Sequence, residues 1–206
     1  AFLVVLLSLF LAYGRRLTES PILIFASKMC NLGYAIPGAV LAIGIMVPLA
    51  HIDNSIDLWF RTQWGFSTGL LLSGSIFAIV FAYVVRFLVL GLGQIDNSLA
   101  KVSPSMDMAA RTLGNKPLRV LLKFHTPAIK GGIFVGAMLV FVDCMKELPA
   151  TLLLRPFNFE TLATHVYLYA SDEMLGEAAL GSITIVLVGL MPVIFLSTMI
   201  RQSRNL

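Results

Sequence analysis

Long uncharged, apolar runs make up most of the chain, and shorter polar segments separate them. A helix that crosses the hydrocarbon core of a bilayer needs about 20 predominantly apolar residues. Four runs meet or nearly meet this length, at residues 30–50, 65–91, 127–145 and 178–200. A fifth run, residues 1–13, spans only about 20 Å as a helix, which indicates the end of a truncated first helix. The pattern therefore predicts an all-α membrane protein with five spans, the first of them partial.

Two longer polar segments connect the predicted spans. Residues 92–126 join the third span to the fourth, and residues 147–177 join the fourth to the fifth. Within the second segment, Leu162, Val166 and Tyr169 follow helical spacing, which predicts a short helix between the last two spans.

The composition agrees with a membrane location. Of the 206 residues, 58% are hydrophobic and 13% are charged, whereas a soluble domain carries about 25% charged residues. This excludes a disordered chain, a secreted disulfide scaffold and most water-soluble enzymes. The two cysteines, Cys30 and Cys144, lie far apart in apolar surroundings, so we expect small core residues there and no metal or redox site.

The basic residues predict an orientation. Most of the 15 lysines and arginines fall in residues 14–29, residues 92–126 and the carboxyl tail, and Arg86 and Lys130 join them at the expected membrane edge. Because basic loops face the cytoplasm, these segments and the carboxyl terminus are expected inside and residues 147–177 outside. The net charge of +4 therefore needs no nucleic-acid partner.

The cytoplasmic loop carries signals for two helices joined by a turn. Ser105 and Asp107 are helix-capping types ahead of an Ala-rich stretch, and Gly114 suits the left-handed turn that ends a helix. A second helix is expected to start at Asn115, with Pro117 in its first turn. The loop is thus predicted to form a bent pair of helices that projects into the cytosol.

This loop resembles a known motif. Met108-Ala109-Ala110, Gly114 and Pro127 keep the intervals of the EAA loop, E-A-A-x3-G-x9-I-x-L-P, of type I ABC importer permeases. The chain therefore looks like the permease of a binding-protein-dependent importer. In that family the first EAA helix docks into a groove on the cytoplasmic ATPase subunit and transmits its closure to the membrane helices.

Three positions depart from the family pattern. Met108 stands where the family usually has glutamate, Phe124 where it has isoleucine, and Thr126 where it has leucine. Asp107, one position before Met108, is a candidate substitute for the missing carboxylate. The residues to which the resemblance assigns ATPase coupling are Asp107, Met108, Ala109, Ala110, Arg111, Gly114 and Pro127.

Further segments resemble the ferric-iron branch of these permeases. They are residues 33–38, 146–151, 155–163 and 170–173. In that branch one polypeptide often carries two permease halves in tandem, and this chain is similar to the carboxyl-terminal half. Permeases for thiamine and phosphonate are close to the same branch, so another small solute stays open as the cargo.

The resemblance implies a multi-pass protein of the bacterial inner membrane that is not an enzyme and needs no cofactor. Its expected partners are two cytoplasmic ABC ATPase subunits, a second permease half, fused or separate, a periplasmic substrate-binding protein and the lipid membrane. ATP hydrolysis is expected in the ATPase subunits.

Two acids are candidates for an outer vestibule on the translocation path. Asp143 and Glu147 lie four residues apart and would share a helical face if the fourth span continued past Asp143. An inert pair of acids at the membrane–water interface is an equally good interpretation. His51, His125 and His165 are dispersed, so no resident metal site is expected.

Two other classes of protein fit the sequence less well. An intramembrane enzyme needs a nucleophile and a base within the spans, and every histidine here falls at a span edge or in a loop. A secondary transporter or channel needs ionisable residues near the bilayer midplane, and the middles of the predicted spans contain none.

Overall fold

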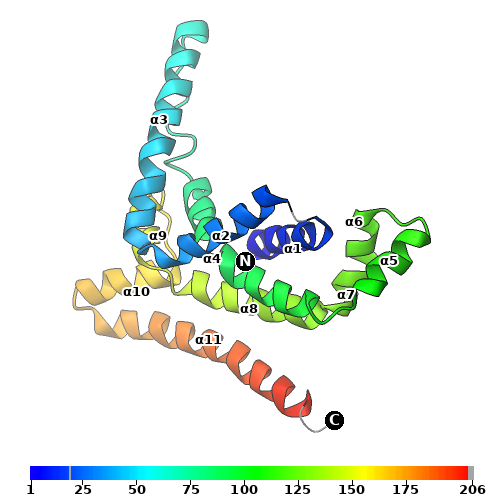
Figure 1. The fold of residues 1–206 in the computed structure, drawn as a ribbon. Coiled ribbons are helices and arrows are strands. Elements are labelled where there is room, and N and C mark those ends of the chain that lie inside the picture. The colour runs from blue at the N-terminus through cyan, green and yellow to red at the C-terminus, as the bar shows by residue number, and fades with distance from the viewer. Residues whose placement is uncertain (19, 204–206) are drawn as a thin grey trace.

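The computed structural model describes the backbone of residues 1–18 and 20–203 and the side chains of residues 1–18 and 20–194. Within these ranges the chain forms helices and no strand, which confirms the predicted all-α fold (Figure 1). The elements are α1 (Phe2–Leu17), α2 (Pro21–Ala35), α3 (Gly38–Trp64), α4 (Ile76–Leu99), α5 (Pro104–Thr112), α6 (Pro117–Val120), the π-helix η1 (Leu121–His125), α7 (Thr126–Ala128), α8 (Lys130–Met145), α9 (Pro149–Leu154), α10 (Leu162–Ser171) and α11 (Leu175–Ser203). Arg204 of the carboxyl tail, which is expected on the cytoplasmic side, lies outside the described residues.

Helix α4 is the centre of the bundle, because α1, α2, α3, α8 and α9 all pack against it. Glycines allow two of these helices to approach it closely. A Cβ atom at Gly33 of α2 would collide with the Val85 carbonyl, and one at Gly132 of α8 would collide with the Ser98 hydroxyl. Small residues of this kind are typical of helix packing in membranes.

Three helices are long and apolar enough to cross a membrane: Gly38–Trp64, Ile76–Leu99 and Leu175–Ile194. A fourth span is available if Pro117–Ala128 and Lys130–Met145, which meet at a bend of 82°, count as one. The run expected as a single span at residues 30–50 is divided between α2 and α3. Ile36 adopts an extended conformation there, because Pro37 disfavours helical geometry in the preceding residue.

Helix α4 begins at Ile76, although the uncharged run begins at Gly65. Helix α3 extends past the apolar run to Trp64, and Gly65, with φ of +73°, ends it. The return segment, residues 65–75, then folds back along α3.

Two carboxylates of α3 hold this return segment. Asp53, which is fully buried, accepts hydrogen bonds from the backbone N–H groups of Leu71, Leu72 and Ser73 at 2.8–3.2 Å. Asp57 accepts one from Thr68 N at 2.8 Å. The segment therefore satisfies its own polar groups against α3 instead of starting the next helix.

The later start of α4 changes the position of Arg86. This residue lies near the middle of α4, and not at the membrane edge as the sequence suggested. The expectation that the middle of each span is free of ionisable residues is therefore wrong for α4.

The segment between α8 and α11 contains two helices. The short helix expected around residues 162–169 is confirmed as α10, whose first turn is capped by Thr161 and Thr164. Helix α9 is additional, and its Ala150, Thr151 and Leu154 are buried against α3 and α4. This part of the predicted external segment therefore belongs to the core of the bundle.

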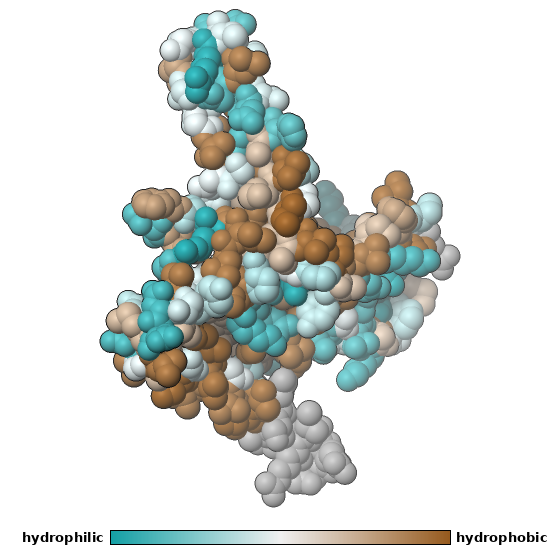
Figure 2. All heavy atoms as spheres, turned by 90° about the vertical axis from the view of Figure 1, so that its left-hand side faces the viewer, coloured by the Kyte–Doolittle hydropathy of each residue, from teal (hydrophilic) through white to brown (hydrophobic). Residues whose placement is uncertain are grey.

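Much of the outer surface is apolar. Figure 2 shows a broad apolar area below the projecting end of α3. Large exposed hydrophobic side chains include Val40 and Val47 of α3 and Leu180, Val186 and Leu187 of α11. A surface of this kind suits contact with lipid or with other membrane helices.

The close contact at Gly33 can be tested by Gly33→Ala, with Gly44→Ala in α3 as the control. A Cβ atom at Gly44 meets nothing within 4 Å, whereas one at Gly33 meets backbone. We expect Gly33→Ala to destabilise the protein by about 1–3 kcal/mol through overpacking and Gly44→Ala to leave stability unchanged. Thermal unfolding of the purified transporter measures both variants, and equal midpoints would contradict the packing described for α2 and α4.

Candidate coupling site

The coupling elbow, residues 103–128, is the bent helical segment between α4 and α8. Its first arm, α5, is capped by Ser103, whose Oγ accepts a hydrogen bond from Ser105 N at 3.3 Å. The cap thus lies before Ser105 and Asp107, because Pro104 fits the first helical position and fixes the start of the helix. Gly114, with φ of +76°, ends the arm in the left-handed turn that its sequence position predicts.

The second arm contains α6, η1 and α7. Asn115, expected as its cap, instead closes the turn, since its Nδ2 donates to the Ala110 carbonyl at 3.1 Å and Lys116 takes the cap position. Pro127 lacks the N–H that would continue the helical ladder, and the Thr126 hydroxyl donates to the Leu121 carbonyl at 3.0 Å. The π-helical turns of η1 precede this proline and lead the chain into α8.

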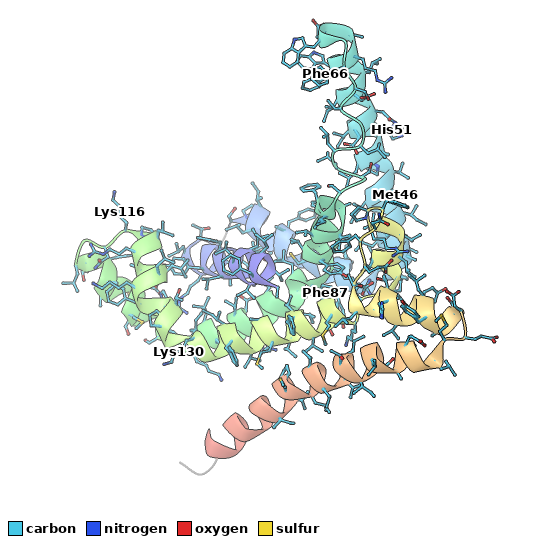
Figure 3. All side chains as sticks on the ribbon, turned by 180° about the vertical axis from the view of Figure 1, so that it is seen from behind. Met46, His51, Phe66, Phe87, Lys116 and Lys130 are labelled. Atoms are coloured by element: carbon cyan, nitrogen blue, oxygen red, sulfur yellow. The ribbon has the colours of Figure 1, made fainter. Side chains whose placement is uncertain are left out.

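The elbow has a solvent-facing side that is partly apolar. Met108 is 61% exposed and Leu113 is 80% exposed, and Ala109 and Arg111 are also exposed. Figure 3 places Lys116 at the end of the elbow farthest from the bundle and Lys130 where the elbow meets α8. Met108 and Leu113 lie between the candidate spans, and this side of the elbow is therefore a candidate contact surface.

A groove follows the second arm. It has a volume of about 570 Å³ and is lined by Lys116, Leu118, Arg119, Leu122 and Lys123. Its lining thus combines two leucines with three basic residues.

The inner side of the elbow packs against the bundle. Ala110 is buried in a cluster that includes Tyr13 of α1, Leu99 of α4, and Val120 and Leu121 of the second arm. The two alanines of the motif therefore differ: Ala110 packs inward, and Ala109 faces solvent.

Asp107 connects the elbow to two other parts of the chain. Its Oδ2 accepts a hydrogen bond from Arg16 Nε at 2.8 Å, and its Oδ1 accepts one from His125 Nε2 at 2.6 Å. Arg16 also donates to the carbonyls of Leu99 and Val102, at 2.6 and 2.8 Å. The Asp107 carboxylate therefore faces the permease core, with both oxygens occupied.

His125 is fully buried beside Asp107, and its ring centroid lies 5.2 Å from that of Tyr13. Within the described residues its Nδ1 has no hydrogen-bond partner, which suits the tautomer that carries the proton on Nε2. The histidine thus acts as the donor in its bond to Asp107.

These contacts shift the acidity of Asp107. Burial alone would raise the pKa of its carboxyl, but the hydrogen bonds from His125 and Arg16 and the positive charge of Arg16 outweigh burial and lower the pKa. The carboxylate is thus ionised at neutral pH and holds α5 to α1 and to η1.

The structure separates the two candidate vestibule acids. Helix α8 ends at Met145, so Asp143 and Glu147 do not share one continuous helix. Asp143 pairs with Lys146 at 2.6 Å, whereas Glu147 is buried and pairs with Arg86 at 3.1 Å. Among the described residues, no group of three histidine, cysteine or acidic side chains is arranged to hold a metal ion.

Arg16, His125 and Arg86 are the residues that sequence reasoning did not assign to a site. Each depends on a partner on another helix, and no local motif marks Arg16 or Arg86. The only local signal is the position of His125 within the motif, between Phe124 and Thr126.

Comparison with known proteins relates the chain to transport-system permeases of Haemophilus influenzae. No family model matches the chain. It is 28% identical over 196 residues to the Fe(3+)-transport system permease protein FbpB 2, a match that covers 95% of this chain and 36% of that protein. It is 29% identical over 126 residues to the molybdenum transport system permease protein ModB, which covers 59% of this chain and 51% of that protein.

The chain thus spans about a third of the length of the first relative and about half of the second. Both relatives are named as permeases, and the first match extends over nearly the whole chain. The chain is therefore a homologue of the permease proteins of Fe(3+) and molybdenum transport systems, in agreement with the resemblance to type I ABC importer permeases that its elbow carries.

Proposed function

We propose that the chain is the membrane permease unit of an ATP-driven importer and that the coupling elbow is its contact with a cytoplasmic ATPase. The observation that carries this proposal is the exposed apolar side of the elbow. Met108 and Leu113 are solvent-exposed on a segment outside the candidate spans. Their burial against a partner would remove apolar surface from water.

The partner surface is expected to be apolar with an acidic rim. The groove of the second arm offers Leu118 and Leu122 with Lys116, Arg119 and Lys123 around them. Basic residues at the rim of an interface favour an acidic partner and speed association. Met108 replaces the glutamate of the family pattern, so an apolar contact takes the place of an ion pair at that position.

Asp107 transmits movement of the elbow into the membrane helices. It is bonded to Arg16 of α1 and to His125 of η1, and η1 continues through α7 into α8. A shift of α5 therefore pulls on both α1 and the cytoplasmic end of α8. In this assignment ATP hydrolysis belongs to separate ATPase subunits, a second permease half completes the path, and a periplasmic binding protein delivers the cargo.

Ferric iron is the proposed cargo, since the match to an Fe(3+)-transport permease covers 95% of the chain. The molybdenum transport permease gives molybdenum as the second candidate. The protein is assigned to the bacterial inner membrane, with the elbow and the carboxyl terminus in the cytoplasm.

The contact surface can be tested by disulfide crosslinking in the assembled transporter. In a background with Cys30→Ser and Cys144→Ser, we expect Met108→Cys to crosslink to a cysteine in the ATPase groove, because its side chain is exposed on the elbow. Leu58→Cys is the control, since Leu58 is 63% exposed on α3, away from the elbow. Failure of Met108→Cys to crosslink to any ATPase subunit would remove the basis of the coupling assignment.

The role of Asp107 can be tested with Asp107→Asn. Loss of the charge weakens the bonds from Arg16 and His125, and we expect a destabilisation of the elbow by about 1–3 kcal/mol together with fewer cargo molecules imported per ATP hydrolysed. Asp96→Asn is the matched control, because its pair with Arg15 is more exposed and contributes about 0–1 kcal/mol. An unchanged import ratio in Asp107→Asn would show that Asp107 does not transmit the movement.

The cargo can be tested by uptake into proteoliposomes that contain the complete transporter and its binding protein. We expect ATP-dependent accumulation of Fe(3+), with no accumulation when ATP is replaced by ADP. Preferential accumulation of molybdate would assign the chain to the second candidate instead.

A further inference from the structure

Arg86 is a charged residue deep within the apolar part of the bundle. The Arg15–Asp96 ion pair, 2.9 Å long, marks the cytoplasmic end of α4. At 1.5 Å per residue, Arg86 lies about 15 Å further along the helix, which is about half of a hydrocarbon core of about 30 Å. Figure 3 shows its neighbour Phe87 in the middle of the bundle. A charge at this depth is costly to retain and marks a functional position.

Arg86 bridges two other parts of the chain. Its Nη1 donates to the Ile36 carbonyl at 2.8 Å. Its Nε lies 3.1 Å from Glu147 Oε2, an ion pair that lacks the geometry of a hydrogen bond. Glu147 in turn accepts a hydrogen bond from Ala150 N at 3.2 Å through Oε1. A continuous chain of polar contacts therefore runs from the α2–α3 break, through α4, to the α8–α9 break.

Each end of this chain is a backbone group that a broken helix leaves without its usual partner. Ile36 is the C-cap residue of α2, so no N–H of a following helical turn donates to its carbonyl. Ala150 is in the first turn of α9, so its N–H has no carbonyl acceptor within the helix. In a bilayer such groups must be satisfied within the protein. Arg86 and Glu147 supply the missing partners and neutralise each other.

The surrounding packing fixes this arrangement. A Cβ atom at Gly38 would lie 2.5 Å from Glu147 Oε1 and 3.4 Å from Arg86 Nη1. One turn along α4, the hydroxyl of Tyr83 lies 2.5 Å from the hydroxyl of Thr151, which donates to the Glu147 carbonyl at 2.9 Å. Two polar contacts thus hold α9 to α4: Thr151 bonds to Tyr83, and Ala150 bonds to Glu147, which pairs with Arg86.

The position of α8 gives the ion pair a mechanical role. This helix starts at Lys130, where the coupling elbow ends, and stops at Met145, directly before Glu147. Gly136 of this helix faces Gln94 and Gly91 of α4, and Val140 packs in one buried cluster with Phe87. A displacement of the elbow along α8 therefore moves Glu147 relative to Arg86.

We propose that the Arg86–Glu147 ion pair is an intramembrane latch that holds α9 and the α2–α3 break against α4 in the resting transporter and opens when ATP binding displaces α8. The proposal rests on the proposed coupling function. Both residues act as positioning residues of the translocation path, and neither contacts the cargo. Opening of the latch frees α9 and allows the two helix breaks to change angle.

The latch can be tested in the complete transporter in proteoliposomes with Arg86→Gln/Glu147→Gln. The double variant removes both charges but keeps an amide donor for Ile36 and an amide oxygen for Ala150. We expect it to assemble, to hydrolyse ATP without the binding protein about tenfold faster than the wild type, and to import less cargo per ATP. The single variants, which leave one charge unpaired, are expected to assemble poorly.

Arg155→Gln/Glu160→Gln is the matched control, because it removes the same pair of residue types from a more exposed ion pair. We expect this control to behave as the wild type. Wild-type hydrolysis and import in Arg86→Gln/Glu147→Gln would overturn the latch. If the wild-type protein bound no ATPase, the proposed function would be contradicted. The latch would then fail with it, because it rests on that function.

Hydrogen exchange in the wild-type complex provides a test that needs no variant. We expect the amides of α9 to be protected without nucleotide and to exchange faster with a non-hydrolysable ATP analogue, since α9 is released from α4. Equal exchange of α9 in the two states would overturn the proposal, whether or not the double variant assembles.

Discussion

A helix that is interrupted inside a bilayer leaves backbone groups that water cannot reach, and this constraint explains the polar contacts at two helix breaks of the bundle. The chain interrupts its helices before Pro37 and again after Met145, and it bends by 82° where the elbow meets α8. At the first two places a charged side chain supplies the missing partner. The charges in the core are therefore required by the path of the backbone, and their pairing sets which helices stay together.

Helix α8 connects the two polar centres of the molecule. At one end, Asp107 bonds to His125, which is followed by α7 and α8; at the other end, Glu147 pairs with Arg86. Between these ends, Gly132 and Gly136 let α8 pack closely against α4. In the proposed function, a helix with a polar contact at each end carries a displacement from the elbow to the Arg86–Glu147 pair.

The sequence predicts the features that depend on local chemistry. The helical class, the left-handed turn at Gly114 and the short helix now identified as α10 follow from composition, a single glycine and a spacing pattern. The start of α4 could not be predicted, because the uncharged residues 65–75 satisfy their polar groups by contact with Asp53 and Asp57 of α3. The depth of Arg86 and the burial of Glu147 follow from that start and from the break after α8, so they also depend on tertiary contacts.

The Arg16–Asp107 contact has a consequence for how the protein is made. The two residues are separated by 91 positions, and the helices α2, α3 and α4 lie between them. Contacts between distant segments form late, after the intervening chain has folded. The elbow therefore reaches its final shape only after these helices have been inserted and packed. A newly synthesised chain with misplaced helices cannot form this contact, so the proposed docking of an ATPase onto the elbow is restricted to correctly folded protein.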